Sequence, residues 1–534
     1  MRIDAVSSFF GLGFSTSLAL AIVGCPPSFV APCRDVDCEP SQNDGGVEDL
    51  AKRRTPLGIT SVTIDGNPSR MIRQGFGGAP SNGTTTVRLI GDQLDTVTGI
   101  SVGDGPNALP GAILSKTSTE LAFTVAVRHG APIGRQPVVA TAPYDSAKFT
   151  DAIEITAITA APVGSDALDV ALDSTGTHEH PLRSMTRAIT LAEAGDTVFL
   201  KNGTYDMVHG ETFAKPTKHQ VIPNVPPDII IKGESTNGTL LQGPPATDCT
   251  NFENAFVALA TAEKARIETL GISDFCWVGI HTERDVMVKS VAIRRVGTGV
   301  SAGANVTLDS MDIAESNDGI HLKNRAGTVI ISNSHVHHNG TGIQGAADAA
   351  LVITSSEIDH NGLSNEIDFN GGLVVAGPTT VEDVKFSENQ PFGVNITDLG
   401  ATGPLVISKS SFSANLSAGI FVGGTARVSV RHSSFDRDSK AIYVTSDSII
   451  DLGTQDNLGE NSFTICSMCD GIFDARPATV ERLSPISLTG NNWSDGEPPH
   501  GCSDVDHPKT VHPPRQWHIE HPGACSSKGN VIIN

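Results

Sequence analysis

The sequence predicts a parallel β-solenoid, in which each repeat of the chain forms one coil, and two observations support this. Between residues 278 and 442 a glycine followed by a branched aliphatic residue returns about every 20 to 30 positions. Between these marks apolar residues alternate with polar ones and the run ends at Asn or Asp, as in Val329-Ile330-Ile331, Val336 and Asn339. A repeat of this length with period-2 alternation is typical of a solenoid. The glycine series is Gly279-Ile280, Gly299-Val300, Gly319-Ile320, Gly342-Ile343, Gly372-Leu373, Gly393-Val394, Gly419-Ile420 and, more weakly, Ala441-Ile442.

The aliphatic residue of each repeat is expected to point inward and to stack on its counterpart one coil away. Because no single coil can bury its own apolar face, the stack of coils is the folding unit. Glycine and asparagine both accept the left-handed backbone conformation, so we expect the Gly and Asn of each repeat to occupy the sharp corners.

The N-terminal segment predicts export. Residues 9–23 are apolar but interrupted, too short for a convincing membrane span. They end in Ile22-Val23-Gly24-Cys25, which resembles a bacterial lipobox and implies cleavage before a lipidated Cys25. We therefore predict a signal peptide over residues 1–24, a Pro- and Gly-containing tether over residues 25–56, and lipid anchoring at the outer membrane or cell surface. An ordinary secretory signal and a misplaced start codon are the alternatives.

The cysteine count agrees with an oxidising compartment. The chain has nine cysteines, and lipidation of Cys25 leaves an even eight. An even number in an exported chain favours disulfides, although their connectivity cannot be read from the sequence. The candidates are Cys33, Cys38, Cys249, Cys276, Cys466, Cys469, Cys502 and Cys525.

Residues 57–160 predict a small β-sandwich, because short alternating strands are separated by turn signals. The segments Ile59-Thr60-Ser61-Val62, Thr86-Val87-Arg88-Leu89-Ile90-Gly91-Asp92-Gln93-Leu94 and Gly99-Ile100-Ser101-Val102-Gly103 resemble the immunoglobulin-like domain of plexins and some transcription factors. In bacterial surface proteins the resemblance implies a spacer.

A short helix is predicted next, because Leu182, Met185, Ile189 and Ala192 share one helical face. With the following segment Gly195-Asp196-Thr197-Val198-Phe199-Leu200-Lys201-Asn202-Gly203-Thr204-Tyr205, it resembles the uncharacterised opening module of many bacterial β-helix proteins. The helix would cover the open apolar end of the first coil. The solenoid is accordingly placed over residues 165–495.

The C-terminal residues 496–534 predict a Cys-, His- and Pro-rich cap or tail. Its histidines lack the ligand spacing of zinc sites, so no metal site is predicted, and no cofactor is expected; calcium has no specific support. The net charge of −22 argues against nucleic acid or anionic lipid surfaces as the main partner.

The coil repeats as a whole resemble the right-handed parallel β-helices of the pectate-lyase-like superfamily of carbohydrate-binding proteins and sugar hydrolases. The resemblance implies an all-β, right-handed fold, and a substrate groove along outward side chains of stacked strands. It does not establish activity, because fold does not imply function.

Aligning two coils on Asn339 and Asn361 predicts an outward polar patch. His335 would stack on Glu357 and His337 on Asp359, with His338 and His360 at the corner. Asp359 would orient His337 as a general base, which makes these two the catalytic candidates. The expected binding residues are His335, His337, His338, Glu357, Asp359, His360, Glu366, Asp368 and Lys385, and Asp318 and His321 would extend the patch.

Two classes of function stay open. The first is a lipid-anchored surface protein, expected to be a monomer, that binds polysaccharide or cell-envelope matrix without catalysis, or serves only as a structural display rod. The second is an extracellular polysaccharide lyase, hydrolase or epimerase. Charged side chains on the surface of a solenoid commonly have no specific role, so the patch alone does not decide between these two classes of function. We favour the binding protein.

Overall fold

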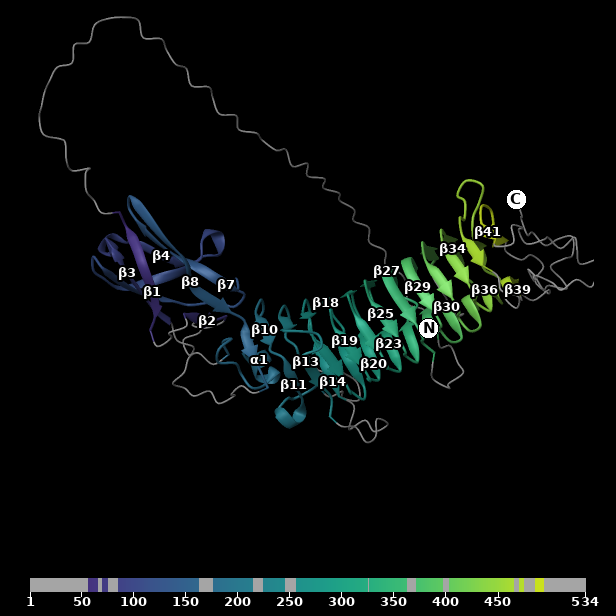
Figure 1. Cartoon of the computed structure of the whole chain (residues 1–534), viewed down its shortest axis with the longest axis horizontal. Coiled ribbons are helices and arrows are strands. Elements are labelled where there is room, and N and C mark those ends of the chain that lie inside the picture. The colour runs from purple at the N-terminus through teal and green to yellow at the C-terminus, as the bar shows by residue number, and fades with distance from the viewer. Residues whose placement is uncertain are drawn as a thin grey trace, which may run out of the picture. The chain divides into compact units, whose positions relative to one another are not determined.

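The computed structural model describes residues 56–65, 70–74, 85–162, 176–214, 224–244, 256–324, 326–362, 371–396, 403–464, 470–474 and 486–493. Met1–Arg54 and Thr55–Asn534 form separate units, and the described residues all belong to the second. The described secondary structure is almost entirely β-strand, as predicted, with one α-helix, α1 (Met185–Leu191) (Figure 1). The 3₁₀ turns are η1 (Leu94–Thr96), η2 (Gly105–Asn107) and η3 (Met207–His209).

The N-terminal part of this unit is an eight-stranded sheet in the order β1-β3-β6-β5-β4-β7-β8-β2. Its strands are β1 (Gly58–Ile64), β2 (Met71–Arg73), β3 (Thr85–Asp92), β4 (Gly99–Val102), β5 (Leu109–Lys116), β6 (Glu120–Val125), β7 (Gly134–Ala142) and β8 (Asp145–Thr156). Strand β3 buries Val87 and Leu89 and exposes Arg88, which is the period-2 pattern of a half-buried strand. The apolar residues of the sheet form a core of their own. The immunoglobulin-like assignment stays a prediction.

Helix α1 forms where the apolar spacing predicts it. The Ser184 Oγ caps the helix by accepting a hydrogen bond from the Arg187 N–H at 3.2 Å. Leu182, Met185 and Ile189 are all buried in the solenoid core. The first solenoid strand is β9 (Ile158–Ala160), which pairs with β10 (Thr197–Leu200). The solenoid thus begins before residue 165, where we expected its start.

The solenoid strands form three parallel sheets, and the first described strand of the third begins only at Val257. The first sheet contains β9, β10, β12 (Ile230–Gly233), β15 (Arg266–Glu268), β18 (Val286–Lys289), β21 (Val306–Asp309), β24 (Thr328–Ser332), β27 (Ala350–Asp359), β29 (Thr379–Ser387), β31 (Leu405–Ser408), β34 (Arg427–Arg431), β37 (Ile449–Asp451) and β40 (Ile486–Ser487).

The second sheet contains the later halves of the long strands β27 and β29 together with shorter strands. These are β11 (Gly203–Tyr205), β13 (Thr239–Gln242), β16 (Gly271–Ser273), β19 (Ala292–Arg294), β22 (Asp312–Ala314), β25 (His335–His337), β32 (Ser411–Ser413), β35 (Ser434–Asp436), β38 (Ser462–Thr464) and β41 (Asn492–Trp493).

The third sheet carries the glycine-aliphatic series. Its strands are β14 (Val257–Thr261), β17 (Val278–Thr282), β20 (Thr298–Ala302), β23 (Asp318–Leu322), β26 (Thr341–Gln344), β28 (Gly371–Val375), β30 (Phe392–Ile396), β33 (Ala418–Val422), β36 (Lys440–Val444) and β39 (Asp470–Asp474).

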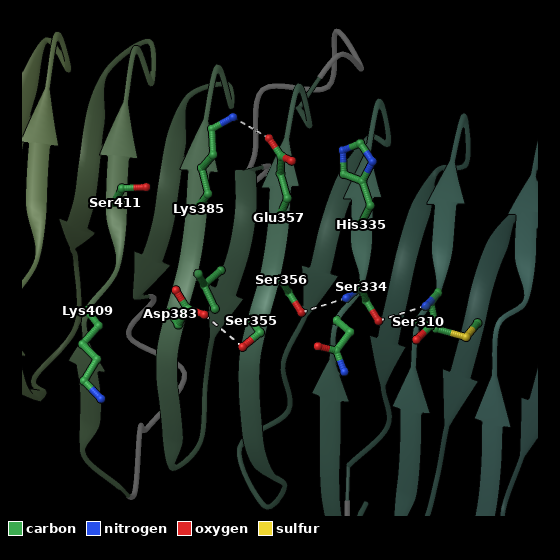
Figure 2. A pocket seen from close by; sticks show the side chains of 13 residues that line it. Ser310, Ser334, His335, Ser355, Ser356, Glu357, Asp383, Lys385, Lys409 and Ser411 are labelled. Atoms are coloured by element: carbon green, nitrogen blue, oxygen red, sulfur yellow. Dashed lines mark hydrogen bonds and ion pairs between the residues drawn. The ribbon is translucent and has the colours of Figure 1, made fainter.

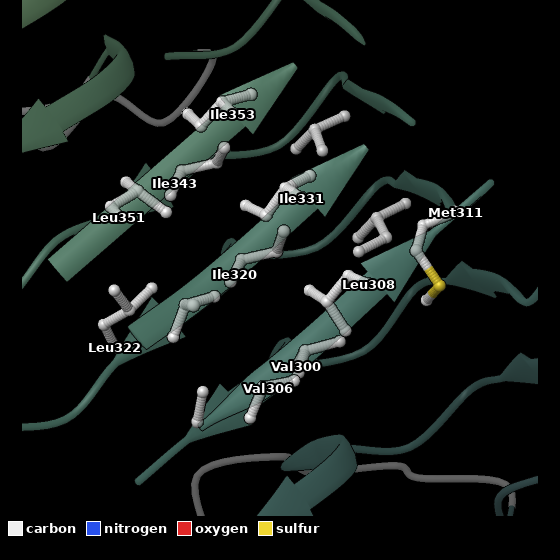
Figure 3. Close-up of a cluster of buried hydrophobic side chains, with 14 of the residues drawn as sticks. Val300, Val306, Leu308, Met311, Ile320, Leu322, Ile331, Ile343, Leu351 and Ile353 are labelled. Atoms are coloured by element: carbon white, nitrogen blue, oxygen red, sulfur yellow. The ribbon is translucent and has the colours of Figure 1, made fainter. Parts of the chain in front are cut away.

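The core is one continuous stack of aliphatic side chains, as predicted. Ile320 lies in register between its counterparts Val300 and Ile343 on the third sheet, and these face Ile331 and its neighbours on the first sheet (Figure 3). All four side chains are fully buried. Farther along, the inward position of the second sheet becomes aromatic, and four phenylalanine rings stack at centroid distances of 4.8 to 5.0 Å. These are Phe386, Phe412, Phe435 and Phe463.

The prediction that the series glycines turn the corners is wrong. They lie inside the strands of the third sheet without positive φ, and what requires glycine is close packing between coils. A Cβ on Gly319 would lie 2.4 Å from the carbonyl oxygen of Gly342, and a Cβ on Gly342 would lie 2.3 Å from that of Gly372. The left-handed corner positions are instead taken by polar residues such as His338 and His360.

The Asn of each repeat also differs from its predicted role, because it is buried next to the corner. The backbone N–H and Nδ2 of Asn339 both donate to Asn361 Oδ1 at 3.1 Å, and Asn361 does the same to Asn389. Asn389 continues to Asn415, and Asn415 donates to Asp438. This asparagine ladder satisfies the buried turn backbone from coil to coil.

Several predicted features lie outside the described residues. They are the signal peptide, Cys25, nearly all of the tether, the C-terminal segment and every candidate cysteine except Cys276. The pairing of the cysteines therefore stays a prediction. Within the described part of the chain, no helix has both the length and the apolar character needed to cross a membrane.

Candidate functional site

The predicted patch lies on the outward face of the second sheet. Strand register pairs His335 with Glu357 and His337 with Asp359, as the alignment on the ladder asparagines predicts. Val336 between the two histidines is fully buried, so both histidines point away from the core. A rigid parallel sheet thus presents imidazoles and carboxylates in neighbouring coils, about 4.8 Å apart.

Asp359 is the most enclosed member of the patch, with a side chain only 11% exposed. Its Oδ1 lies 2.6 Å from His335 Nε2 and its Oδ2 lies 2.7 Å from His360 Nδ1. Burial alone would raise the pKa of Asp359, but the hydrogen bonds from these two histidines lower it to about 2. The same hydrogen bond raises the pKa of His335 despite partial burial. Asp359 is therefore an anion over the whole physiological range of pH.

The partner of His337 is not the one we expected. Its Nε2 lies 2.9 Å from Asp312 Oδ1, one coil earlier, while Asp359 contacts His335 and His360. The rings of His335 and His337 stack at 4.0 Å with an interplanar angle of 19°. Side chains as long as histidine reach diagonal neighbours on a sheet, so in-register Cα atoms do not decide which polar atoms meet.

The corner histidines complete the patch. His338 and His360 have left-handed backbones, with φ of 55° and 52°, and their rings stack at 4.8 Å. Burial lowers the pKa of His338, and the nearby His337 and His360 add to this effect. His338 Nδ1 also lies 2.8 Å from His337 Nδ1, so one of the two nitrogens accepts a hydrogen bond from the other.

A polar groove of about 530 Å³ adjoins the patch at the corner between the first and second sheets (Figure 2). His335, Glu357 and Lys385 form one side, and Lys385 Nζ lies 2.5 Å from Glu357 Oε1. Near the turn, the Ser355 Oγ donates to Asp383 Oδ2 at 2.9 Å. The remaining polar lining residues are Ser310, Asn333, Ser334, Ser356, Lys409 and Ser411.

The groove is held open by a second ladder, made of serines. Ser334 Oγ accepts from the Met311 N–H and Ser356 Oγ accepts from the Ser334 N–H, both at 3.1 Å. Each hydroxyl in turn donates to a carbonyl oxygen of its own coil, at 2.7 Å. Because the bends are tied from coil to coil, the groove lies on a rigid scaffold.

A second depression, of about 920 Å³, lies beside the N-terminal coils. It combines apolar side chains, among them Met207, Val208 and Phe275, with an Arg295–Asp274 ion pair that makes two contacts at 2.7 and 3.2 Å. Apolar side chains make up much of its lining, so it is the weaker candidate for a polar ligand.

Two groups of expected site residues do not join the patch in the described structure. Glu366 and Asp368 lie outside the described residues. Asp318 and His321 do not extend the patch, because they belong to β23 of the third sheet and contact each other at 3.6 Å. Asp312, on the other hand, was missed.

Asp312 was missed because the sequence alignment relied on the ladder asparagines. Its coil has Ser316 where the next has Asn339, and the Ser316 N–H donates to Asn339 Oδ1 at 3.0 Å. An alignment based on the ladder asparagine therefore does not include the coil of Asp312. The regular spacing of Ile313 and Val336 in the inward column was the signal that could have placed it.

Comparison with known proteins supports the fold. Residues 297–454 match the family model described as right handed beta helix region. The protein therefore contains a right-handed parallel β-helix, and its patch and groove present polar side chains along stacked strands. Among curated proteins no match is found.

Among solved structures, the catalytic unit of an α-1,3-glucanase from Streptomyces thermodiastaticus matches at 11% identity and a TM-score of 0.37, covering 82% of this chain and 95% of its own. A pectate lyase matches at 15% identity and 0.33, covering 64% and 79%. An exopolygalacturonase from Yersinia enterocolitica matches at 10% and 0.26, covering 77% and 97%. Likeness at this level carries no argument about activity.

Proposed function

We propose that this chain is an exported, lipid-anchored surface protein whose solenoid binds a hydroxyl-rich polysaccharide without catalysis. The observation that carries the proposal is the groove, which offers hydroxyl groups and paired charges in successive coils on a rigid scaffold. Sugar hydroxyls both donate and accept hydrogen bonds, so they match a surface on which donors and acceptors alternate.

The arrangement of the groove favours an extended ligand. Ser355 and Asp383 occupy equivalent corners of adjacent coils, and Lys409 occupies the next. Likewise Glu357, Lys385 and Ser411 are in register on the second sheet. A linear polymer lying along the coil axis would meet a polar group at each of these positions in successive coils, which no small ligand could use in full.

The electrostatics of the site favour binding over hydrolysis. A glycoside hydrolase needs a carboxylic acid that keeps its proton near neutral pH. Asp359 has a pKa of about 2, so it does not keep a proton near neutral pH. In the part of the chain that the structure describes, burial raises the pKa of the Asp438 carboxyl group to about 7, but this group is sealed within the asparagine ladder and cannot reach a ligand.

The proposed location at the outer membrane or cell surface rests on the lipobox-like Ile22-Val23-Gly24-Cys25 and on the Pro- and Gly-containing tether. A polysaccharide partner belongs to the same compartment. A lipid anchor with a tether would hold the solenoid at the surface, where matrix polymers are found.

The test is a panel of neutral and acidic polysaccharides, each immobilised in a native gel that retards proteins that bind it. We expect retardation by at least one neutral polymer, with no release of shorter sugars on prolonged incubation. The Lys385→Gln variant should show weaker retardation, because the substitution removes the ammonium donor from the groove and breaks the ion pair with Glu357. Retention by none of the polymers, or the release of cleavage products, would contradict the proposal.

A further inference from the structure

Two histidines and a carboxylate converge at one end of the patch. A ring nitrogen of His335, a ring nitrogen of His337 and a carboxylate oxygen of Asp312 all lie within 4.8 Å of one another. They come from β22 and β25, whose register places Asp312 directly beside His335. The three donors are therefore fixed by adjacent strands and not by a loop.

The surroundings orient these donors. Asp359 holds His335 through a hydrogen bond of 2.6 Å, and Arg294 Nη2 occupies Asp312 Oδ2 at 2.5 Å, which leaves Oδ1 toward His337. Carboxylates that hydrogen-bond a histidine are the usual partners of metal-binding imidazoles. The side chain of His337 is largely buried and that of His335 is 42% exposed, so one side of the group is open to solvent.

The donor types select the ion. Imidazole nitrogen suits zinc, copper and nickel, whereas magnesium and calcium prefer oxygen alone. Zinc binds histidine nitrogen and carboxylate oxygen at about 2.0 to 2.2 Å, so neighbouring ligand atoms in a tetrahedral site lie about 3.3 Å apart. The present separation of 2.9 Å between His337 Nε2 and Asp312 Oδ1 needs only a small adjustment to reach this value.

We propose that Asp312, His335 and His337 bind a divalent transition-metal ion of the zinc class, in a site with three protein ligands and an open fourth position. The inference departs from the sequence prediction of no metal site, and it does not depend on polysaccharide binding. A neighbouring group of His335, Glu357 and Asp359 is equally compact. It offers one imidazole where the proposed site offers two, so it suits an ion that prefers nitrogen ligands less well.

The experiment titrates the purified full chain, without a histidine tag, with Zn²⁺ by calorimetry and with Co²⁺ by absorption, in the absence of any sugar. His337→Gln and Asp312→Asn should each weaken one binding event by at least about 100-fold, and Asp359→Asn should weaken it by about 10- to 100-fold. His432→Gln serves as the matched control, because it removes another solenoid histidine paired with a carboxylate, Glu460 at 3.0 Å. It should leave that event unchanged.

Circular dichroism of the metal-free variants checks that each has folded. If His337→Gln does not fold, Asp312→Asn provides the test. Ion binding elsewhere in the chain persists in all variants, so only the difference from the unmodified chain counts. Equal binding by the unmodified chain, His337→Gln and Asp312→Asn would overturn the proposal. Loss with Glu357→Gln but not with His337→Gln would overturn it as well, in favour of the neighbouring group.

Discussion

The asparagine ladder ends in an aspartate, and replacing Asp438 by Asn should stabilise the protein in a pH-dependent way. Asp438 Oδ1 accepts from both the backbone N–H and the Nδ2 of Asn415 at 2.8 Å. Its Oδ2 is buried and has no hydrogen-bond partner among the described residues. Each ladder asparagine donates its Nδ2 to an inward carbonyl of the preceding coil, as Asn415 does to Phe386 O at 3.2 Å. Asn at position 438 would find the corresponding carbonyl at Phe412.

The magnitude follows from the pKa of Asp438, which burial raises from 3.8 to about 7. Because the folded state holds this proton more tightly than the unfolded state, stability is highest below the unfolded pKa. It falls as the pH rises toward the folded pKa. Between about pH 5 and about pH 8 the cost of ionising Asp438 grows by about 2 to 3 kcal/mol. The amide of Asp438→Asn does not titrate, so the variant avoids this loss.

Thermal melts followed by circular dichroism at the two pH values measure the effect. The advantage of Asp438→Asn over the unmodified chain should be larger at about pH 8 than at about pH 5. Asp383→Asn makes the same chemical change at an exposed corner, and it should alter stability little and equally at both. A variant that gains nothing at the higher pH, or gains equally at both, would refute this reasoning.

Three further predictions concern the coils and the anchor. Ile343→Asp places an unpaired charge in the fully buried stack and should lower the free energy of unfolding, measured by chemical denaturation, by more than about 4 kcal/mol. Gln344→Asp on the outward neighbour should lower it by less than about 1 kcal/mol. Similar losses at the two positions would mean that the register is wrong. Gly319→Ala should destabilise by about 1 to 3 kcal/mol in the same assay, because its Cβ would lie 2.4 Å from the carbonyl oxygen of Gly342; an unchanged midpoint would contradict the close packing. Mass spectrometry of the mature protein should find an acylated peptide beginning at Cys25, and a free N-terminus elsewhere would remove the anchor.

The architecture could be predicted because each coil of the solenoid repeats the same pattern of apolar, polar and glycine residues in the sequence. Alternation of apolar residues reports which side chains face the core, and the register of His335 with Glu357 follows from it. The role of the series glycines could not be predicted in the same way. Glycine permits both a left-handed backbone and a close approach of two chains, and only the structure shows that Gly319 serves the second purpose.

The details of the site depend on side-chain reach, which sequence register does not contain. The sequence predicts that Asp359 hydrogen-bonds His337, but the Asp359 carboxylate instead contacts His335 and His360. The hydrogen-bond partner of His337 is Asp312. Of the groove lining, the sequence predicts His335, Glu357 and Lys385 as site residues. It does not predict the serines and corner residues, because these are the commonest surface types and carry no chemical signature of their own.

The most direct test of the binding proposal compares two arginine substitutions in one column of the second sheet. Ser411 lines the groove, and Ser434 and Ser462 follow it in register, one and two coils farther along. Once a retained polysaccharide is known, its affinity is measured for Ser411→Arg and for Ser462→Arg. The account predicts that the first, whose long side chain fills the groove, loses at least about 10-fold in affinity and that the second binds like the unmodified chain. Unchanged binding by Ser411→Arg, with the fold intact, would contradict it.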